Sequence, residues 1–152
     1  PGPLPKAARV RVLRWNQELQ VIAQRLSSQC KSTLNTSIIM VTDSSPQLRV
    51  NFAVSKDTIN KPRWTQALMH WYNEVNRVKP DVIYRQSLQI DNYAAMIWGN
   101  TGIVGCGYSA CKGKDKGVRV KFYVCVFAPA GNKEGVKMYY TDKSEYEIFT
   151  TT

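Results

Sequence analysis

The chain has 152 residues, of which 43% are apolar, so its composition fits one globular domain with its own core and excludes a disordered chain. No apolar run approaches the length that spans a membrane, so we expect no transmembrane segment. The formal charge of +10, from 21 Lys and Arg against 11 Asp and Glu, predicts attraction to polyanions such as sulfated glycans, anionic lipids or nucleic acids.

Two amphipathic helices are predicted in the first half of the chain. The first runs from about residue 7 to residue 29, because apolar side chains recur there at steps of three and four, at Val12, Trp15, Leu19, Ile22 and Leu26. Cys30 continues this stripe, so its sulfur is expected on the core side. The second helix follows Lys61 and Pro62 and runs to about residue 78, before Pro80, with the stripe Trp64, Leu68, Trp71, Val75 and Val78.

The segment between the two helices is predicted to hold two short strands. They lie at residues 37–41 and 48–54, around a turn of Asp, Ser and Pro at residues 43–46. Asn35 begins an N-glycosylation sequon with Thr36 and Ser37, so it is a candidate glycosylation site on a surface loop of a secreted protein. Residues 79–89, beyond the second helix, are expected to form an irregular connection.

The second half of the chain is predicted to be organised around a β-hairpin. A short helix pattern at residues 90–98 leads to a strand at 103–108, a basic loop at 112–117 and a second strand at 118–127. The second strand alternates cleanly between two faces, and the hairpin would place Cys106 opposite Cys125, close enough for a disulfide bond. The tail, residues 136–152, is expected to add an edge segment.

The titratable residues offer little catalytic or metal chemistry. His70 is the only histidine, and it lies one turn before Glu74 on the same predicted helix face. A His–Glu pair could share a proton or hold a metal weakly, but no second histidine completes a site and nothing nearby resembles a nucleophile elbow. We therefore interpret His70 as an ordinary helix side chain, and we expect no catalytic residue, no cofactor and no bound metal.

Four cysteines in a small domain are typical of a disulfide framework in an oxidising compartment. Their positions allow three pairings. The spacing of Cys106 and Cys111 is loose for a zinc knuckle, and no second pair or histidine lies near them. Disulfide bonds are therefore the better interpretation.

The clearest local cluster of charge is the basic loop together with the start of the strand that follows it. Its five cations make it the candidate site for polyanion contact: Lys112, Lys114, Lys116, Arg119 and Lys121. Apart from Tyr123, no aromatic side chain lies near enough to stack on bases, so specific nucleic-acid binding is not expected. The alternative is a solvated hairpin tip.

Short motifs recur in one order along most of the chain, at residues 13–19, 23–25, 71–74, 96–101, 104–107, 123–125 and 129–132. In this order they resemble the CAP superfamily, which includes cysteine-rich secretory proteins, insect-venom antigen 5 and plant pathogenesis-related proteins. The spacing of Cys106 and Cys111 is also similar to that in venom-allergen-type CAP proteins secreted by parasitic nematodes.

The resemblance implies an α+β fold, a three-layer α-β-α sandwich with a central antiparallel sheet, in a single domain over residues 1–152 that lacks the family's first helix. It implies disulfides from Cys106 to Cys125 and from Cys30 to Cys111. The family's cleft gathers two histidines and two glutamates that can hold a divalent metal. One histidine belongs to the missing helix, and the other three positions match Val50, Glu74 and Asn92, so the resemblance implies that this metal site is absent.

For function, the resemblance implies a secreted, extracellular and non-enzymatic protein that acts by binding. The leading hypothesis is a protein that modulates host cells or defence by contacting a host or cell-surface protein. The alternative is a carrier of sterols or fatty acids, and a further alternative is a basic module that binds polyanions such as sulfated glycans.

Overall fold

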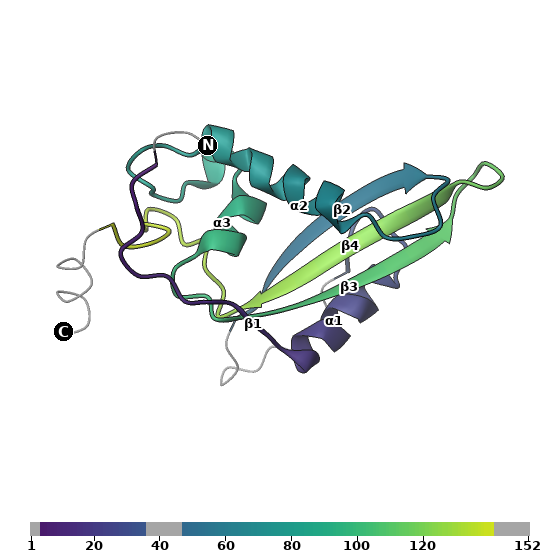
Figure 1. Ribbon diagram of the computed structural model, residues 1–152, viewed down its shortest axis with the longest axis horizontal. Coiled ribbons are helices and arrows are strands. Elements are labelled where there is room, and N and C mark those ends of the chain that lie inside the picture. The colour runs from purple at the N-terminus through teal and green to yellow at the C-terminus, as the bar shows by residue number, and fades with distance from the viewer. Residues whose placement is uncertain (1–3, 36–46, 142–152) are drawn as a thin grey trace.

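Three layers form the fold, with one sheet between helices (Figure 1). The computed structural model describes residues 4–35 and 47–141, so the predicted strand at 37–41, the turn at 43–46 and the end of the tail lie outside the described residues. The sheet has the order β1-β3-β4-β2, with β1 at Arg14–Trp15, β2 at Arg49–Asp57, β3 at Ile103–Lys112 and β4 at Arg119–Ala128.

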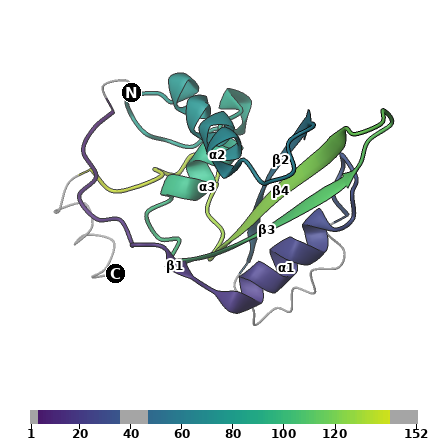
Figure 2. The same cartoon turned by 45° about the vertical axis from the view of Figure 1, so that its right-hand side comes forward.

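The helices lie on both faces of this sheet. α1 (Gln17–Ser27) covers one face, and α2 (Trp64–Tyr72) and α3 (Asp91–Ile97) cover the other (Figure 2). This arrangement confirms the predicted α+β three-layer sandwich. β2, β3 and β4 pair antiparallel as expected, whereas the two-residue β1 runs parallel to β3, so the sheet as a whole is mixed.

The first helix is shorter than its hydrophobic periodicity predicts. α1 begins at Gln17 because Asn16 is in an extended conformation and its Oδ1 accepts a hydrogen bond from the backbone N of Leu19 at 2.9 Å. The predicted start at residue 7 is wrong. Val12 is 85% exposed and Trp15 is 58% exposed, so the first two residues of the predicted stripe face solvent in a non-helical segment.

Each disulfide ties β3 to a neighbouring element. Cys30 lies beyond the end of α1 with a positive φ of 54° and is exposed, so the prediction that it continues the buried stripe is wrong. It is bonded to Cys111 in β3, with 6.0 Å between the Cα atoms. Cys106 is bonded to Cys125, its partner in the β3–β4 register. The structure therefore has the two bonds that the resemblance implies.

The alternation of β4 sends successive side chains into two separate cores. The core under α1 contains Leu19, Ala23, Leu26, Val124, Val126 and Ala128. The core under α2 and α3 contains Trp71, Ala95, Cys125 and Phe127. This division follows the period of two that the sequence shows in residues 118–127.

α1 packs directly onto the backbone of β3 at two glycines. A β-carbon added at Gly105 would lie 2.2 Å from the backbone N of Gln20, and one added at Gly107 would lie 2.4 Å from the backbone N of Gln24. Both distances are far inside van der Waals contact with main-chain atoms that cannot turn aside. The absence of side chains at these two positions therefore sets how closely the helix approaches the sheet.

The second helix changes its winding before the predicted end at residue 78. α2 stops at Tyr72 and continues as the 3-10 helix η2 (Asn73–Arg77), and a second 3-10 turn, η3 (Gln86–Leu88), precedes α3. Leu68, which the periodicity placed in the core, is 45% exposed, and Ala67 is buried instead. Glu74 is buried within η2.

A third apolar cluster lies beyond the sheet, where residues 79–90 meet residues 136–140. It contains Val82, Tyr84, Ile90, Ala94, Trp98, Met138 and Tyr139. Isolated β-bridges pair Ile83 with Lys137 and Arg9 with Tyr140. The described part of the tail therefore pairs with the segments around Arg9 and Ile83 through single bridges, and it does not add an edge strand to the sheet.

Lys121 is fully buried and does not belong to the basic surface. Its Nζ lies 2.6 Å from Oδ1 of Asp57 on β2, and it donates a hydrogen bond to the backbone O of Lys61 at 2.8 Å. The assignment of Lys121 to the polyanion candidate is therefore wrong, because its charge is paired inside the fold. The hydrogen bond from Lys121 is the main cause that holds the pKa of Asp57 below its usual value.

We expect Lys121→Ala to destabilise the protein at neutral pH more than Lys121→Met. The alanine variant loses three buried methylenes at about 0.8 kcal/mol each, roughly 2 kcal/mol in all, whereas methionine keeps most of this packing. Because the pKa of Asp57 is lowered, its pairing stabilises the fold fully above the ordinary value of 3.8 and ceases to do so as the pH falls through the lowered value.

The gap in stability between the wild type and Lys121→Met should therefore close as the pH falls below 3.8. Urea unfolding at neutral pH and in acid measures both effects. Equal losses for the two variants, or a gap that is independent of pH, would contradict this assignment.

Candidate functional site

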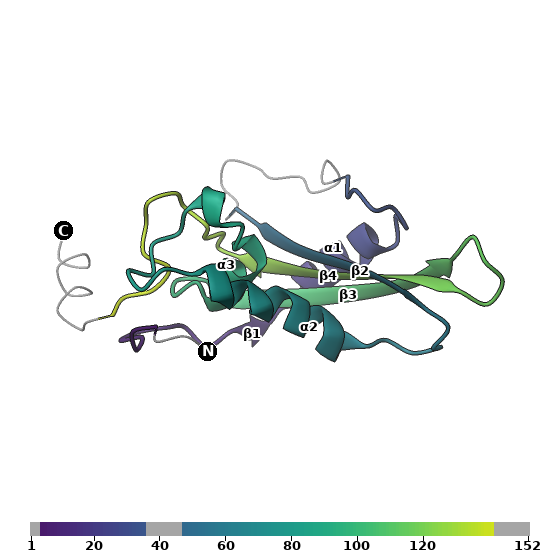
Figure 3. The ribbon, with the colours of Figure 1, turned by 90° about the horizontal axis from the view of Figure 1, so that it is seen from above.

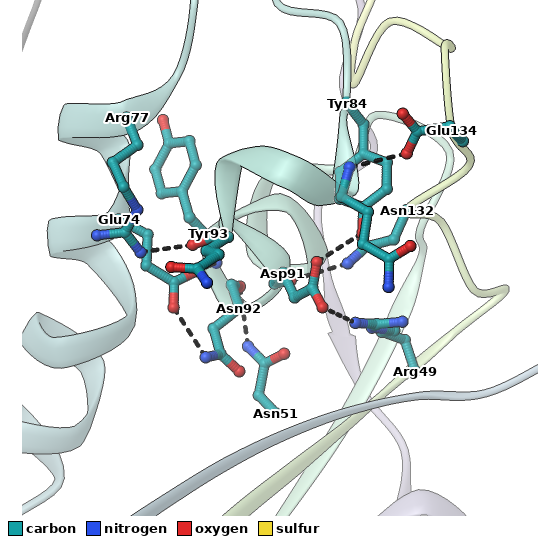
Figure 4. Close-up of polar contacts among 12 residues, drawn as sticks. Arg49, Asn51, Glu74, Arg77, Tyr84, Asp91, Asn92, Tyr93, Asn132 and Glu134 are labelled. Carbon is teal, nitrogen blue, oxygen red and sulfur yellow. Dashed lines mark hydrogen bonds and ion pairs between the residues drawn. The ribbon is translucent and has the colours of Figure 1, made fainter.

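Polar side chains gather where η2, β2 and the start of α3 meet, on the face of the sheet away from α1 (Figure 4). Glu74, only 9% exposed, comes from η2. Its Oε2 accepts a hydrogen bond from Nδ2 of Asn92 at 2.8 Å, and its Oε1 accepts one from the backbone N of Tyr93 at 2.9 Å. Because both oxygens have partners in the first turn of α3, this carboxylate joins η2 to α3.

Asn51 of β2 completes this cluster. Its side chain is fully buried, and its Nδ2 donates to the backbone O of Asn92 at 2.9 Å. Val50, the position that matched a cleft residue of the family, packs instead in the core under α1. The placement of Val50 in the cleft is therefore wrong, because adjacent residues of a strand point to opposite faces. Asn51 occupies the position beside Asn92 and Glu74.

A second group of polar contacts surrounds Asp91. Its Oδ2 lies 2.9 Å from Nη2 of Arg49, and its Oδ1 accepts a hydrogen bond from the hydroxyl of Tyr84 at 2.5 Å. Asn132 donates from Nδ2 to the backbone O of Asp91 at 2.9 Å. Burial first, and then the hydrogen bond to Asp91, raises the pKa of Tyr84 to about 12, so this phenol stays protonated near neutral pH and acts as a donor. These contacts join β2, α3 and the turn after β4.

His70 does not take part in either group. It is exposed in the last turn of α2, whereas Glu74 lies in η2 and points inward to α3, so the His–Glu pair considered from the sequence is not formed. Arg77 follows Glu74 in η2, and its guanidinium donates to the backbone oxygens of Leu88 and Gln89. These bonds hold the connection that precedes α3 against η2.

The polar side chains around Glu74 do not fit a divalent metal. Across residues 4–35 and 47–141, no three His, Cys, Asp or Glu side chains come together as metal ligands. The usual zinc site has three or four such donors. Here amide donors from Asn92 and the Tyr93 backbone occupy both oxygens of Glu74, and all four cysteines are in disulfides.

Residues 6–127 match the CAP family, the cysteine-rich secretory protein family. The chain belongs to this family. Among curated CAP relatives, venom allergen 5 of Polistes dominula is 32% identical over 146 residues, which cover 91% of this chain and 60% of that protein. The chain therefore spans less than two thirds of the length of this CAP relative.

Solved CAP structures share the fold. Venom allergen-like protein 4 of Schistosoma mansoni superposes with a TM-score of 0.70 at 23% identity, over 95% of this chain and 84% of that chain. NaASP2, solved with Zn²⁺, superposes with a TM-score of 0.69 at 23% identity, over 91% of this chain and 70% of that chain. At this level of identity the likeness establishes the CAP fold, and the polar cluster around Glu74 is judged from its own residues.

The other candidate sites of this CAP chain lie on its surface. Lys112, Lys114, Lys116 and Arg119 are exposed around the connection from β3 to β4. Asn35 is exposed too, and glycosylation there stays a prediction because Thr36 and Ser37 lie outside the described residues. The helices within the described ranges are too short or too polar to cross a bilayer.

Sequence reasoning missed most of the polar residues that surround α3 in this CAP chain. A usable signal existed for two of them, because Arg49 and Asn51 are polar residues at alternate positions of a predicted strand and so share a face. The contacts of Tyr84, Asp91 and Asn132 join segments that are not paired in any strand register, and no local pattern indicates them.

Proposed function

We propose that this CAP chain is a secreted, non-enzymatic protein that acts on a host or its defences by binding a cell-surface protein. The observation that carries the proposal is that both carboxylate oxygens of Glu74 are hydrogen-bonded within the fold. Its two oxygens accept hydrogen bonds from Asn92 and from the backbone of Tyr93, which supports a structural role for the carboxylate over a role as acid, base or metal ligand. With this polar cluster engaged inside the fold, the outer surface is the proposed place of contact.

Secretion is supported by the cysteines and by the relatives. Two disulfide bonds, Cys30–Cys111 and Cys106–Cys125, are typical of proteins that mature in an oxidising compartment. The family is described as secretory, and the similar curated proteins are named venom allergens. The same names support the proposal that the protein acts on a host or on its defences.

A protein partner is supported by the outer side of α2. Three large apolar side chains are exposed within one stretch of this helix, with exposed fractions of 45% for Leu68, 50% for Met69 and 39% for Tyr72. Neighbouring exposed apolar side chains are typical of surfaces that contact other proteins. A lipid carrier would instead need its apolar contacts inside a cavity.

Binding to intact cells tests the proposal. Fluorescently labelled protein should bind a panel of animal cells saturably, should be displaced by unlabelled protein, and should lose its binding when the cells are first treated with trypsin. Native mass spectrometry of the same preparation tests the alternative, because it detects a sterol or fatty acid that stays bound to the protein. Unsaturable binding together with one bound sterol or fatty acid per chain would contradict the proposal and favour a lipid carrier.

A further inference from the structure

The connection between β3 and β4 is rich in positive charge. Figures 1 and 3 show this hairpin projecting beyond α1 and α2. Lys112, Lys114, Lys116 and Arg119 are all exposed there, and Asp115 is the one carboxylate between them in the chain. A projecting and strongly basic hairpin can reach a polymer that the rest of the surface does not touch.

The sheet places two of these cations face to face. Lys112 is the partner of Arg119 in the β3–β4 register. Like charges directly opposite each other in an antiparallel pair are destabilising. Asp57 is the partner of Arg119 on the other side, but its carboxylate is bonded to Lys121 at 2.6 Å. Within the described ranges, no ion pair offsets the charge of Lys112 or Arg119.

Two further cations reach the same end from distant parts of the sequence. Lys31 follows Cys30, which is bonded to Cys111 near the end of β3, so Lys31 lies at the same end of the sheet as the hairpin. Lys56 is the register neighbour of Val120 in β4. Both lysines are exposed. We call this end of the molecule the basic end, and its cations, which lie on both faces of the sheet, are Lys31, Lys56, Lys112, Lys114, Lys116 and Arg119.

We propose that the basic end binds a sulfated glycan chain, and that this glycan is part of the cell-surface partner; the inference rests on the proposed function. Lysine and arginine side chains on alternate residues of a projecting hairpin can pair with successive sulfates of a linear polymer, and the release of counterions drives such binding. The sulfate groups of the glycan then supply Lys112 and Arg119 with the negative charge that no ion pair in the described part of the fold supplies.

The side chains around the basic end favour a glycan over a nucleic acid or a lipid surface. Single-stranded nucleic acid needs exposed aromatic rings for stacking, but the ring of Tyr108 packs against Tyr123, and Phe122 and Tyr123 are buried. Insertion into a membrane surface needs apolar anchors, and residues 112–117 contain none. Two disulfides place the chain where sulfated glycans are the abundant polyanions.

Binding to heparin, measured by calorimetry and by affinity chromatography, tests the site. The triple variant Lys114→Glu, Lys116→Glu and Arg119→Glu should bind heparin at least about tenfold more weakly near 0.15 M salt, with a shallower dependence on salt concentration. The control variant Arg14→Glu, Lys79→Glu and Lys133→Glu makes the same change in net charge at exposed cations outside the basic end, and it should lose less than about threefold.

Equal losses in the two triple variants, or a wild type that does not bind heparin, would overturn the proposal. Equal or tighter binding of single-stranded DNA or of phosphatidylserine vesicles would also overturn it.

The variant Lys112→Thr distinguishes a role of Lys112 in glycan binding from a role in the stability of the fold. Removal of the facing like charge should leave the melting temperature unchanged or raised while heparin binding falls. A fall in melting temperature with unchanged heparin binding would mean that Lys112 serves the fold.

Treatment of cells with heparinase separates this inference from the proposed function. We expect heparinase to remove most of the saturable binding of the wild type to intact cells. Binding that is lost with trypsin but persists after heparinase would overturn the glycan inference and leave the proposed function standing. A wild type that binds heparin but no cells would contradict the proposed function.

Discussion

We expect Gly107→Ala to lower the free energy of unfolding by about 3 kcal/mol or more. The added β-carbon would lie 2.4 Å from the backbone N and 2.5 Å from the Cα of Gln24 in α1. Relief requires the helix to move off the sheet, which opens the core beneath it, where Ala23 and Leu26 are fully buried. Equilibrium unfolding in guanidinium chloride, monitored by circular dichroism, measures the loss.

Gly99→Ala is the matched control for this prediction. Its added β-carbon would meet its nearest neighbours, the backbone O of Arg9 and atoms of Tyr139, at 3.4 Å, and its φ does not require glycine. We expect a change within about 1 kcal/mol. If Gly107→Ala proved as mild as Gly99→Ala, the close contact between α1 and β3 would be wrong.

The second large effect is expected at Glu74. Glu74→Ala leaves the backbone N of Tyr93 and the amide of Asn92 without the buried acceptors that lie 2.9 Å and 2.8 Å away, and this should cost about 3 kcal/mol. Glu74→Gln keeps an acceptor for Tyr93, and rotation of the Asn92 amide can satisfy the new donor. We therefore expect glutamine to cost about 1 kcal/mol.

Thermal and urea unfolding of the two variants, compared with Asp115→Ala as an exposed carboxylate control, measure these losses. A Glu74→Ala variant as stable as the control would show that the carboxylate does not hold η2 to α3. In that case the observation that carries the proposed function would fail as well.

The parts of the fold that follow a simple period could be predicted from the sequence. The alternation of β4 placed Val124 and Cys125 in opposite cores because a strand has a period of two. The start of α1 could not be predicted in this way. Val12 and Trp15 continue the helical spacing, but the capping bond of Asn16 begins the helix after both of them.

The candidate site depended on contacts that the sequence does not encode locally. Sequence matching placed Val50 in the cleft, and a difference of one residue along a strand was enough to bring Asn51 there instead. Lys121 resembled its basic neighbours in the chain, yet Asp57 on a different strand neutralises it within the fold. Both errors concern the face or the partner of one side chain, and neither changes the layers of the fold.

The most direct test of the structural role of Glu74 is calorimetric titration of the metal-free protein with zinc, together with its melting temperature in a modest excess of zinc. We expect no stoichiometric binding and no rise in melting temperature, because both oxygens of Glu74 are bonded within the fold and no set of three ligands forms in the described residues. A tight one-to-one zinc site that stabilises the wild type and is lost in the folded Glu74→Gln variant would contradict this.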